Sequence, residues 1–183
     1  MTSAPQLTPP KAGEYSPFYA GYISRVSGDV LAAFRSQRES TLAMLRAVGE
    51  AQAGHRYAPG KWSVREVVGH MADTERTMAY RALRVARGET TPAPSFDENA
   101  YVPAGEFERR TLASVIDEFA VNRDSTIALF AGFPAAAWER VGVAADGSRI
   151  SLRALAYIIA GHELHHVDGL QTRYGLKASG SKR

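Results

Sequence analysis

Apolar residues recur at spacings of three and four along four stretches of the chain, as they do on the buried face of a helix. In the last stretch, Leu152, Leu155, Ile159 and Leu170 fall on one such face. No stretch alternates convincingly between apolar and polar residues, so the pattern predicts helices and no strands. The predicted helices run from about Ser27 to Gly49, Ser63 to Arg87, Thr111 to Phe130 and Ser151 to Gly175.

Residue types that favour helix caps stand at the predicted helix ends. Ser63 and Glu66 have the spacing of a capping box, and Gly88 follows that helix as a natural stop. Ser151 is a second serine at an N-cap position. We therefore expect the second and fourth helices to begin at these two serines.

Long connections separate the later helices. Residues 90–106 carry three prolines and are not expected to form one continuous helix. Residues 135–150 carry Gly142 and the turn sequence Asp146-Gly147. Four long helices with such connections predict an all-α fold, a four-helix bundle with long crossover loops, in which ligand and metal sites lie between facing helices.

The chain is expected to form one domain, because 183 residues bury a core without additional cross-links. The bundle is predicted over residues 16–175. Residues 1–15 are rich in proline, serine and threonine and predict a flexible N-terminal arm. Residues 176–183 predict a flexible C-terminal tail.

The composition narrows the chemistry that the chain can support. Hydrophobic residues make up 45% and charged residues 22%, and the formal charge of +3 comes from scattered Lys and Arg, which argues against a nucleic-acid partner. The absence of cysteine excludes disulfides, a cysteine nucleophile and thiolate metal ligands. No apolar run suits a signal peptide or a membrane span, so we expect a cytoplasmic protein without a membrane partner.

Three histidines form the strongest candidate site. His162 and His166 are four residues apart and therefore lie on the same face of the last helix, beside its apolar stripe. A divalent metal would compensate for burying two imidazoles, although a hydrogen-bonded pair of core histidines is the alternative. His70 on the second helix is the third candidate, and three ligands with one open position are the arrangement of catalytic zinc sites.

The remaining histidines are expected to lie outside this group. His165 points about 100° away from His166, and His55 lies in a loop. Trp62 precedes the second helix and is read as a packing anchor, with a pocket wall as the alternative. Phe96 and Tyr101, in the proline-rich crossover, are candidates for a pocket mouth.

Carboxylates near the histidines offer weaker candidates. Asp73 and Asp168 either orient an imidazole or are solvated helix charges. Glu163 either borders the site or pairs with an arginine of the second helix, Arg76 or Arg81. Glu163 and Asp73 are the candidates for a catalytic base.

The stretch from His162 to His166 also matches H-E-x-x-H, the helix motif of zinc proteases. The protease interpretation fails further along the chain. Thr172 stands where a third ligand would be expected, and no methionine follows Met78. No strand is predicted that would bind a peptide, so we reject a protease.

Two longer segments resemble a known family. "APGKWSVREVVGHMADTER", followed about 80 residues later by "LAYIIAGHELHHVDGLQTRYG", resembles the DinB/YfiT-like superfamily, and the likeness extends from about Tyr15 to Gly175. The resemblance implies a four-helix bundle with a divalent metal, zinc or nickel, bound by His70, His162 and His166. It also implies one of two kinds of activity, that of a transferase or isomerase that uses a low-molecular-weight thiol or that of a metal-dependent hydrolase. Many members of the superfamily form homodimers, so the resemblance also implies a homodimer.

Together these observations favour a metal-dependent enzyme that acts on a small molecule. A thiol-dependent S-transferase with a low-molecular-weight thiol as co-substrate is the leading hypothesis, with a hydrolase as its variant. A non-catalytic stress-response protein that binds a metal or a ligand is the alternative. A helical bundle without metal is a third hypothesis.

Overall fold

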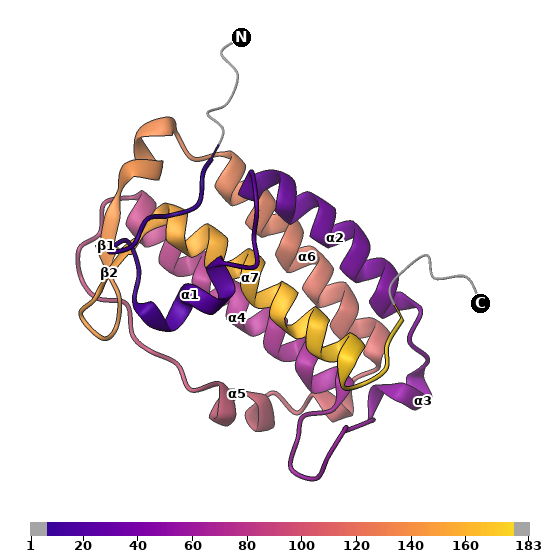
Figure 1. The fold of residues 1–183 in the computed structure, drawn as a ribbon. Coiled ribbons are helices and arrows are strands. Elements are labelled where there is room, and N and C mark those ends of the chain that lie inside the picture. Colours follow the sequence, from indigo (N-terminus) through magenta and orange to yellow (C-terminus); the bar gives the residue numbers. More distant parts are fainter. Residues whose placement is uncertain (1–6, 178–183) are drawn as a thin grey trace.

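The structure is a computed structural model that describes residues 7–177. It confirms the predicted all-α, four-helix bundle (Figure 1). The bundle helices are α2 (Val30–Arg46), α4 (Val64–Ala86), α6 (Leu112–Ala131) and α7 (Leu152–Thr172). Shorter helices are α1 (Ala20–Ile23), α3 (Glu50–Ala53) and α5 (Glu98–Ala104), with 3-10 turns at Pro17–Tyr19, Phe107–Arg109 and Ala135–Glu139.

The helix caps agree with the sequence. The Ser63 hydroxyl accepts a hydrogen bond from the Glu66 backbone while the Glu66 carboxylate accepts one from the Ser63 backbone, which is a complete capping box. Ser151 caps α7 through the backbone N–H of Ala154. The first helix begins later than predicted, at Val30, because Gly28 has φ +72° and Asp29 is the N-cap.

The prediction of no strands is wrong in the connection between α6 and α7. Strands β1 (Val141–Val143) and β2 (Arg149–Ser151) form an antiparallel hairpin around the Asp146-Gly147 turn. Three residues on each side are too few for a visible alternation of apolar and polar residues. The hairpin packs on the end of α4, where Gly142 lies against Val85.

Residues 7–15, the described part of the predicted N-terminal arm, contact the bundle. Leu7 is buried, and its carbonyl lies 2.9 Å from the Tyr157 hydroxyl. Glu14 forms an ion pair of 2.6 Å with Arg153 on α7. Residues 1–6 and 178–183, and with them most of the predicted tail, lie outside the described residues, whereas Leu176 is buried.

Two apolar clusters fill the bundle, and a polar layer separates them along all four long helices. One cluster includes Phe34, Met78 and Phe130, and the other includes Leu42, Met71 and Phe119. The polar layer consists of buried residues at intermediate positions: Gln37 and Thr41 on α2, His70, Thr74 and Glu75 on α4, Asn122, Arg123 and Thr126 on α6, and His162 and Glu163 on α7. The candidate site therefore lies in the middle of the bundle. Within residues 7–177, no helix is long and apolar enough to cross a membrane.

Candidate metal centre

Helices α4 and α7 bring three histidines together. The Nε2 atom of His162 lies 3.1 Å from Nε2 of His70 and 3.0 Å from Nε2 of His166. One nitrogen from each of the three rings lies within 4.8 Å of the other two. The sequence thus identified residues that the fold places in a single cluster.

The chemistry of the cluster suits a cation. Burial lowers the pKa of His70 to about 4, that of His166 to about 3 and that of His162 well below its ordinary value. The rings are therefore neutral at pH 7, and each has one nitrogen lone pair. The Nε2 atom of His162 carries either one proton or one lone pair, so it forms one good hydrogen bond and cannot pair well with both of its Nε2 neighbours at about 3 Å. A divalent ion accepts all three lone pairs, and neutral imidazole is a common metal ligand.

A glycine precedes two of the three histidines and permits another segment to approach closely. A Cβ atom on Gly161 would collide with the backbone carbonyl of Tyr22 in α1. A Cβ atom on Gly69 would collide with the ring of Phe107. Tyr22 consequently packs edge-on against His162, with ring centroids 5.5 Å apart.

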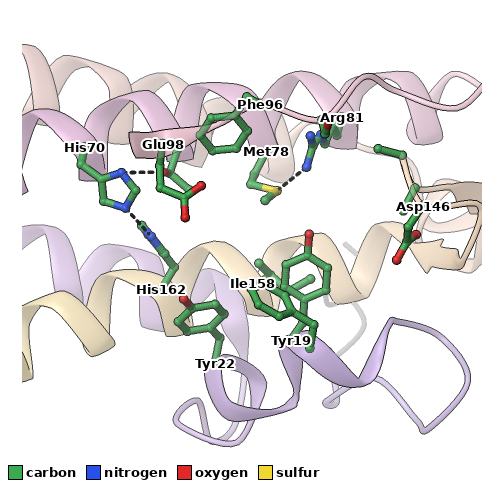
Figure 2. A pocket seen from close by; sticks show the side chains of 15 residues that line it. Tyr19, Tyr22, His70, Met78, Arg81, Phe96, Glu98, Asp146, Ile158 and His162 are labelled. Atoms are coloured by element: carbon green, nitrogen blue, oxygen red, sulfur yellow. Dashed lines mark hydrogen bonds between the residues drawn. The ribbon is translucent and has the colours of Figure 1, made fainter. Parts of the chain in front are cut away.

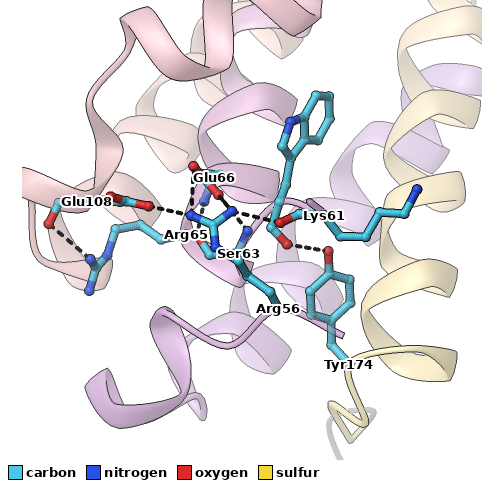
Figure 3. Close-up of polar contacts among 8 residues, drawn as sticks. Arg56, Lys61, Ser63, Arg65, Glu66, Glu108 and Tyr174 are labelled. Atoms are coloured by element: carbon cyan, nitrogen blue, oxygen red, sulfur yellow. Dashed lines mark hydrogen bonds and ion pairs between the residues drawn. The ribbon is translucent and has the colours of Figure 1, made fainter. Parts of the chain in front are cut away.

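The segment before α4 is held by polar contacts (Figure 3). Arg56 donates a hydrogen bond of 2.7 Å to the Lys61 carbonyl and pairs with Glu66 at 2.6 Å. The Tyr174 hydroxyl donates to the Trp62 carbonyl at 2.7 Å. Trp62 is thereby fixed against His70, with ring centroids 4.7 Å apart, so it is both a packing residue and a neighbour of the site.

Glu163 pairs with an arginine other than the two predicted from the sequence. Its partner is Arg123 on α6, at 2.5 Å, and not Arg76 or Arg81 on α4. Arg123 is fully buried and also binds Glu75 with two hydrogen bonds of 2.7 and 2.8 Å. Burial opposes the charge of Arg123, but the two carboxylates outweigh this effect and raise the pKa of the guanidinium.

A signal for Arg123 was nevertheless present in the sequence. Arg123 lies four residues after Phe119 and four before Ile127, on the apolar face of its helix. A charged residue at such a position is rarely buried without a partner. That pattern indicates a buried ion pair, although it does not identify the partner.

The two aspartates have exposed or half-exposed partners. Asp73 lies 3.3 Å from Arg76, and burial raises its pKa while Arg76 opposes the rise. Asp168 lies 3.8 Å from Arg25. The second nitrogen of His70, Nδ1, instead lies 3.5 Å from the hydroxyl of Thr74.

The two other histidines lie outside the cluster. His165 is partly buried, and its ring packs edge-on against Tyr22 with centroids 5.5 Å apart. Burial lowers the pKa of His165, and the nearby cations Arg25 and Arg173 lower it further. His55 is exposed beside Tyr174.

A cavity of about 440 Å³ opens on His70 and His162. Figure 2 shows it extending from these rings at one end to Arg81 and Asp146 at the other. Phe96 lines the cavity, as the sequence suggested, whereas Tyr101 is 47% exposed and packs against Phe96. The cavity wall also includes Tyr19, Tyr22, Met78, Glu98 and Ile158. The volume suits a small molecule.

Comparison with known proteins identifies relatives of this fold. The family model of the DinB superfamily matches residues 33–168. YfiT from Bacillus subtilis, described as a probable metal-dependent hydrolase with an unusual four-helix bundle topology, aligns with a TM-score of 0.68 and 19% identity over 92% of this chain and 94% of its own. A search among curated proteins finds none that matches.

Two further solved structures share the bundle. A mycothiol-dependent maleylpyruvate isomerase aligns with a TM-score of 0.66 and 15% identity over 81% of this chain, which spans only 60% of the isomerase. A DinB-like protein of Bacillus subtilis, YjoA, aligns with a TM-score of 0.58 and 17% identity over 80% of this chain and 89% of its own. At these identities the likeness concerns the fold.

Proposed function

The chain belongs to the DinB superfamily, and on that premise we propose that it is a metal-dependent enzyme acting on a small molecule, specifically a thiol-dependent S-transferase. His70, His162 and His166 would hold a divalent ion, zinc or nickel. The low-molecular-weight thiol is the co-substrate. The convergence of three neutral imidazoles beside a cavity of about 440 Å³ is the observation that supports this proposal best.

A bound ion would supply Lewis acidity, which lowers the pKa of a thiol at its open position. Because the chain has no cysteine, the sulfur must come from the co-substrate. In the transfer, the thiol loses its proton, its sulfur forms a bond to an electrophilic carbon, and the leaving group departs from that carbon with the bonding electrons.

The chain's own residues hold the reactants and accept the proton. Glu163 was a predicted base, but its carboxylate faces Arg123 in the core, and Asp73 does not line the cavity. Glu98 lines the cavity with Tyr22, and burial, together with the charge of Glu98, raises the pKa of the Tyr22 hydroxyl. Glu98 is therefore the better candidate for the proton acceptor, and Tyr22 would position the substrate against His162.

Hydrolysis is the second candidate reaction. It is favoured by the likeness to YfiT, which covers nearly the whole of both chains and whose description names a hydrolase. The same ion would lower the pKa of water. A thiol-dependent activity is favoured by the mycothiol-dependent isomerase, which has the same bundle.

Metal content provides the first test. We expect one divalent ion per chain in the purified protein, lost in the His162→Ala/His166→Ala double variant and kept in the matched His165→Ala control. Metal-loaded protein should then consume a thiol in the presence of chlorodinitrobenzene, whereas hydrolysis of nitrophenyl acetate without thiol would favour the hydrolase. Absence of metal after incubation with zinc and nickel would contradict the proposal.

A non-catalytic metal-binding stress protein is the alternative. A fourth protein ligand closing the site would favour it, because structural zinc sites are closed and catalytic ones keep an open position. X-ray absorption on the metal-loaded protein would count the nitrogen ligands. We further propose a cytoplasmic protein without a nucleic-acid partner, in keeping with its scattered charges, and a homodimer, which sedimentation would test.

A further inference from the structure

A second cavity reaches the histidine cluster from another direction. It measures about 290 Å³ and is lined by His166, the histidine that does not line the first cavity. Among the described residues, no side chain lines both cavities. The three histidines therefore lie between two separate spaces, each large enough for part of a small molecule.

The two cavities differ in charge. Lys61 and Arg173 line the second cavity, and within residues 7–177 neither forms an ion pair with a carboxylate. The carboxylate in its wall, Asp168, lies 3.8 Å from Arg25. The first cavity is lined by a single arginine, Arg81, and by two carboxylates, those of Asp146 and Glu98. The second cavity consequently favours an anion and the first does not.

The second cavity also has rigid aromatic walls. Tyr57, Trp62 and Tyr174 line it, and the rings of Tyr57 and Tyr174 pack edge-to-face with centroids 5.0 Å apart. Figure 3 shows Lys61 extending from the start of α4 toward α7, beside Tyr174. The backbone of Lys61 is held by Arg56, so this end of the cavity is already ordered before a ligand binds.

We infer that the second cavity binds the anionic part of the thiol co-substrate, a molecule with one or more carboxylates. Lys61 and Arg173 bind the carboxylates, the tyrosine and tryptophan rings contact the body of the molecule, and the thiol end reaches the cluster beside His166. The first cavity is then left for the second reactant. This inference rests on the proposed function, because that function requires a thiol co-substrate.

Glutathione, a thiol with two carboxylates, and its diester, in which both are neutral, are suitable probes. Calorimetry on the full-length, zinc-loaded protein would measure their dissociation constants for the unaltered chain, for the Lys61→Ala/Arg173→Ala double variant and for Arg81→Ala. The Arg81→Ala variant is the matched control, because it removes the cation of the other cavity. Both substituted residues of the double variant are exposed, so the fold should be retained, and circular dichroism would verify it.

We expect the dissociation constant of glutathione to rise about tenfold in the double variant and to change less than about twofold in Arg81→Ala, because two exposed charge contacts are lost in the first case and none in the second. The diester should bind the unaltered chain as weakly as glutathione binds the double variant. Equal affinity for glutathione and its diester would overturn the inference. A loss of affinity in Arg81→Ala alone would overturn it too, because the anion would then lie in the first cavity.

An uncharged thiol separates this inference from the proposed function. Mercaptoethanol should change the visible spectrum of the cobalt-loaded protein equally in the unaltered chain and in the double variant. If it does so while glutathione shows no preference over its diester, the thiol site stands and the anion site is wrong. If it leaves the cobalt spectrum unchanged, the proposed thiol chemistry fails, and the calorimetric comparison still decides whether the second cavity binds an anion.

Discussion

Replacing Gly161 by alanine should separate α1 from α7 next to the candidate metal centre. The new Cβ atom would lie 3.0 Å from the Tyr22 Cα atom and still closer to its carbonyl, which is tighter than real Cβ contacts allow. Because the obstacle is backbone, no side-chain rotation can relieve it. Helix α1 must therefore move by on the order of 1 Å, and Tyr22 must move away from His162.

The energetic effect can be estimated against a matched position on the same helix. Overpacking of this kind costs about 1–3 kcal/mol, from which up to about 1 kcal/mol is recovered because alanine favours the helix more than glycine does. A Cβ atom on Gly169 would meet nothing within 4 Å. Gly169→Ala should therefore stabilise the protein by up to about 1 kcal/mol, and the two variants should differ by about 1–3 kcal/mol.

Urea unfolding followed by circular dichroism would measure this difference, and metal analysis would accompany it. We expect Gly161→Ala to keep its metal, because the three ring nitrogens lie on α4 and α7, and to lose affinity for substrates of the first cavity, whose wall includes Tyr22. Equal stability of the two variants would refute the close approach of α1 to α7. Loss of metal in Gly161→Ala would refute the expectation that moving Tyr22 in the cavity wall leaves the three metal ligands in place.

Three further predictions concern the polar layer. Arg123→Met should lower the free energy of unfolding by about 3–5 kcal/mol, because it leaves two buried carboxylates without their cation. Chemical denaturation measures this loss, and in the control, Arg76→Met at an exposed position, the free energy of unfolding should fall by less than about 1 kcal/mol. His70→Ala should weaken zinc binding by roughly a hundredfold or more in a chelator competition, and His165→Ala by less than about threefold; comparable losses in both would mean that the ligand set is wrong. Metal-free protein should lose stability as the pH falls from about 6.5 toward 4, because the histidines bind protons in the unfolded state while burial holds the pKa of His70 in the folded state at about 4. His70 alone contributes on the order of 3 kcal/mol to this loss. Urea midpoints that do not change over this pH range would contradict the burial of the cluster.

Much of the fold was predictable because the relevant signals are local. The capping box of Ser63 and Glu66 involves residues three positions apart, and the structure contains it. His162 and His166 lie on the same face of their helix because helical periodicity brings residues four positions apart onto one side. The hairpin of β1 and β2 was missed because strands of three residues leave too short a pattern.

Contacts between distant segments were decided only by tertiary packing. The apolar face of each helix was visible in the sequence, but the neighbour that this face meets was not. Glu163 therefore received a predicted partner on α4, whereas the bundle places Arg123 of α6 against it. The contacts of the N-terminal segment with Arg153 and Tyr157 were likewise not predictable from the sequence, because they join residues that are far apart in the chain.

The sequence by itself determined where the long helices lie, how two of them are capped and which histidines share a helix face, because a helix repeats every few residues and its signals are short-range. The tertiary structure decided that His70 meets His162 and His166, that the polar layer spans all four long helices, and that two cavities of different charge reach the cluster. The physical reason is that these features depend on the relative placement of whole helices, which is set by the collective packing of their apolar faces and not by any short stretch of residues.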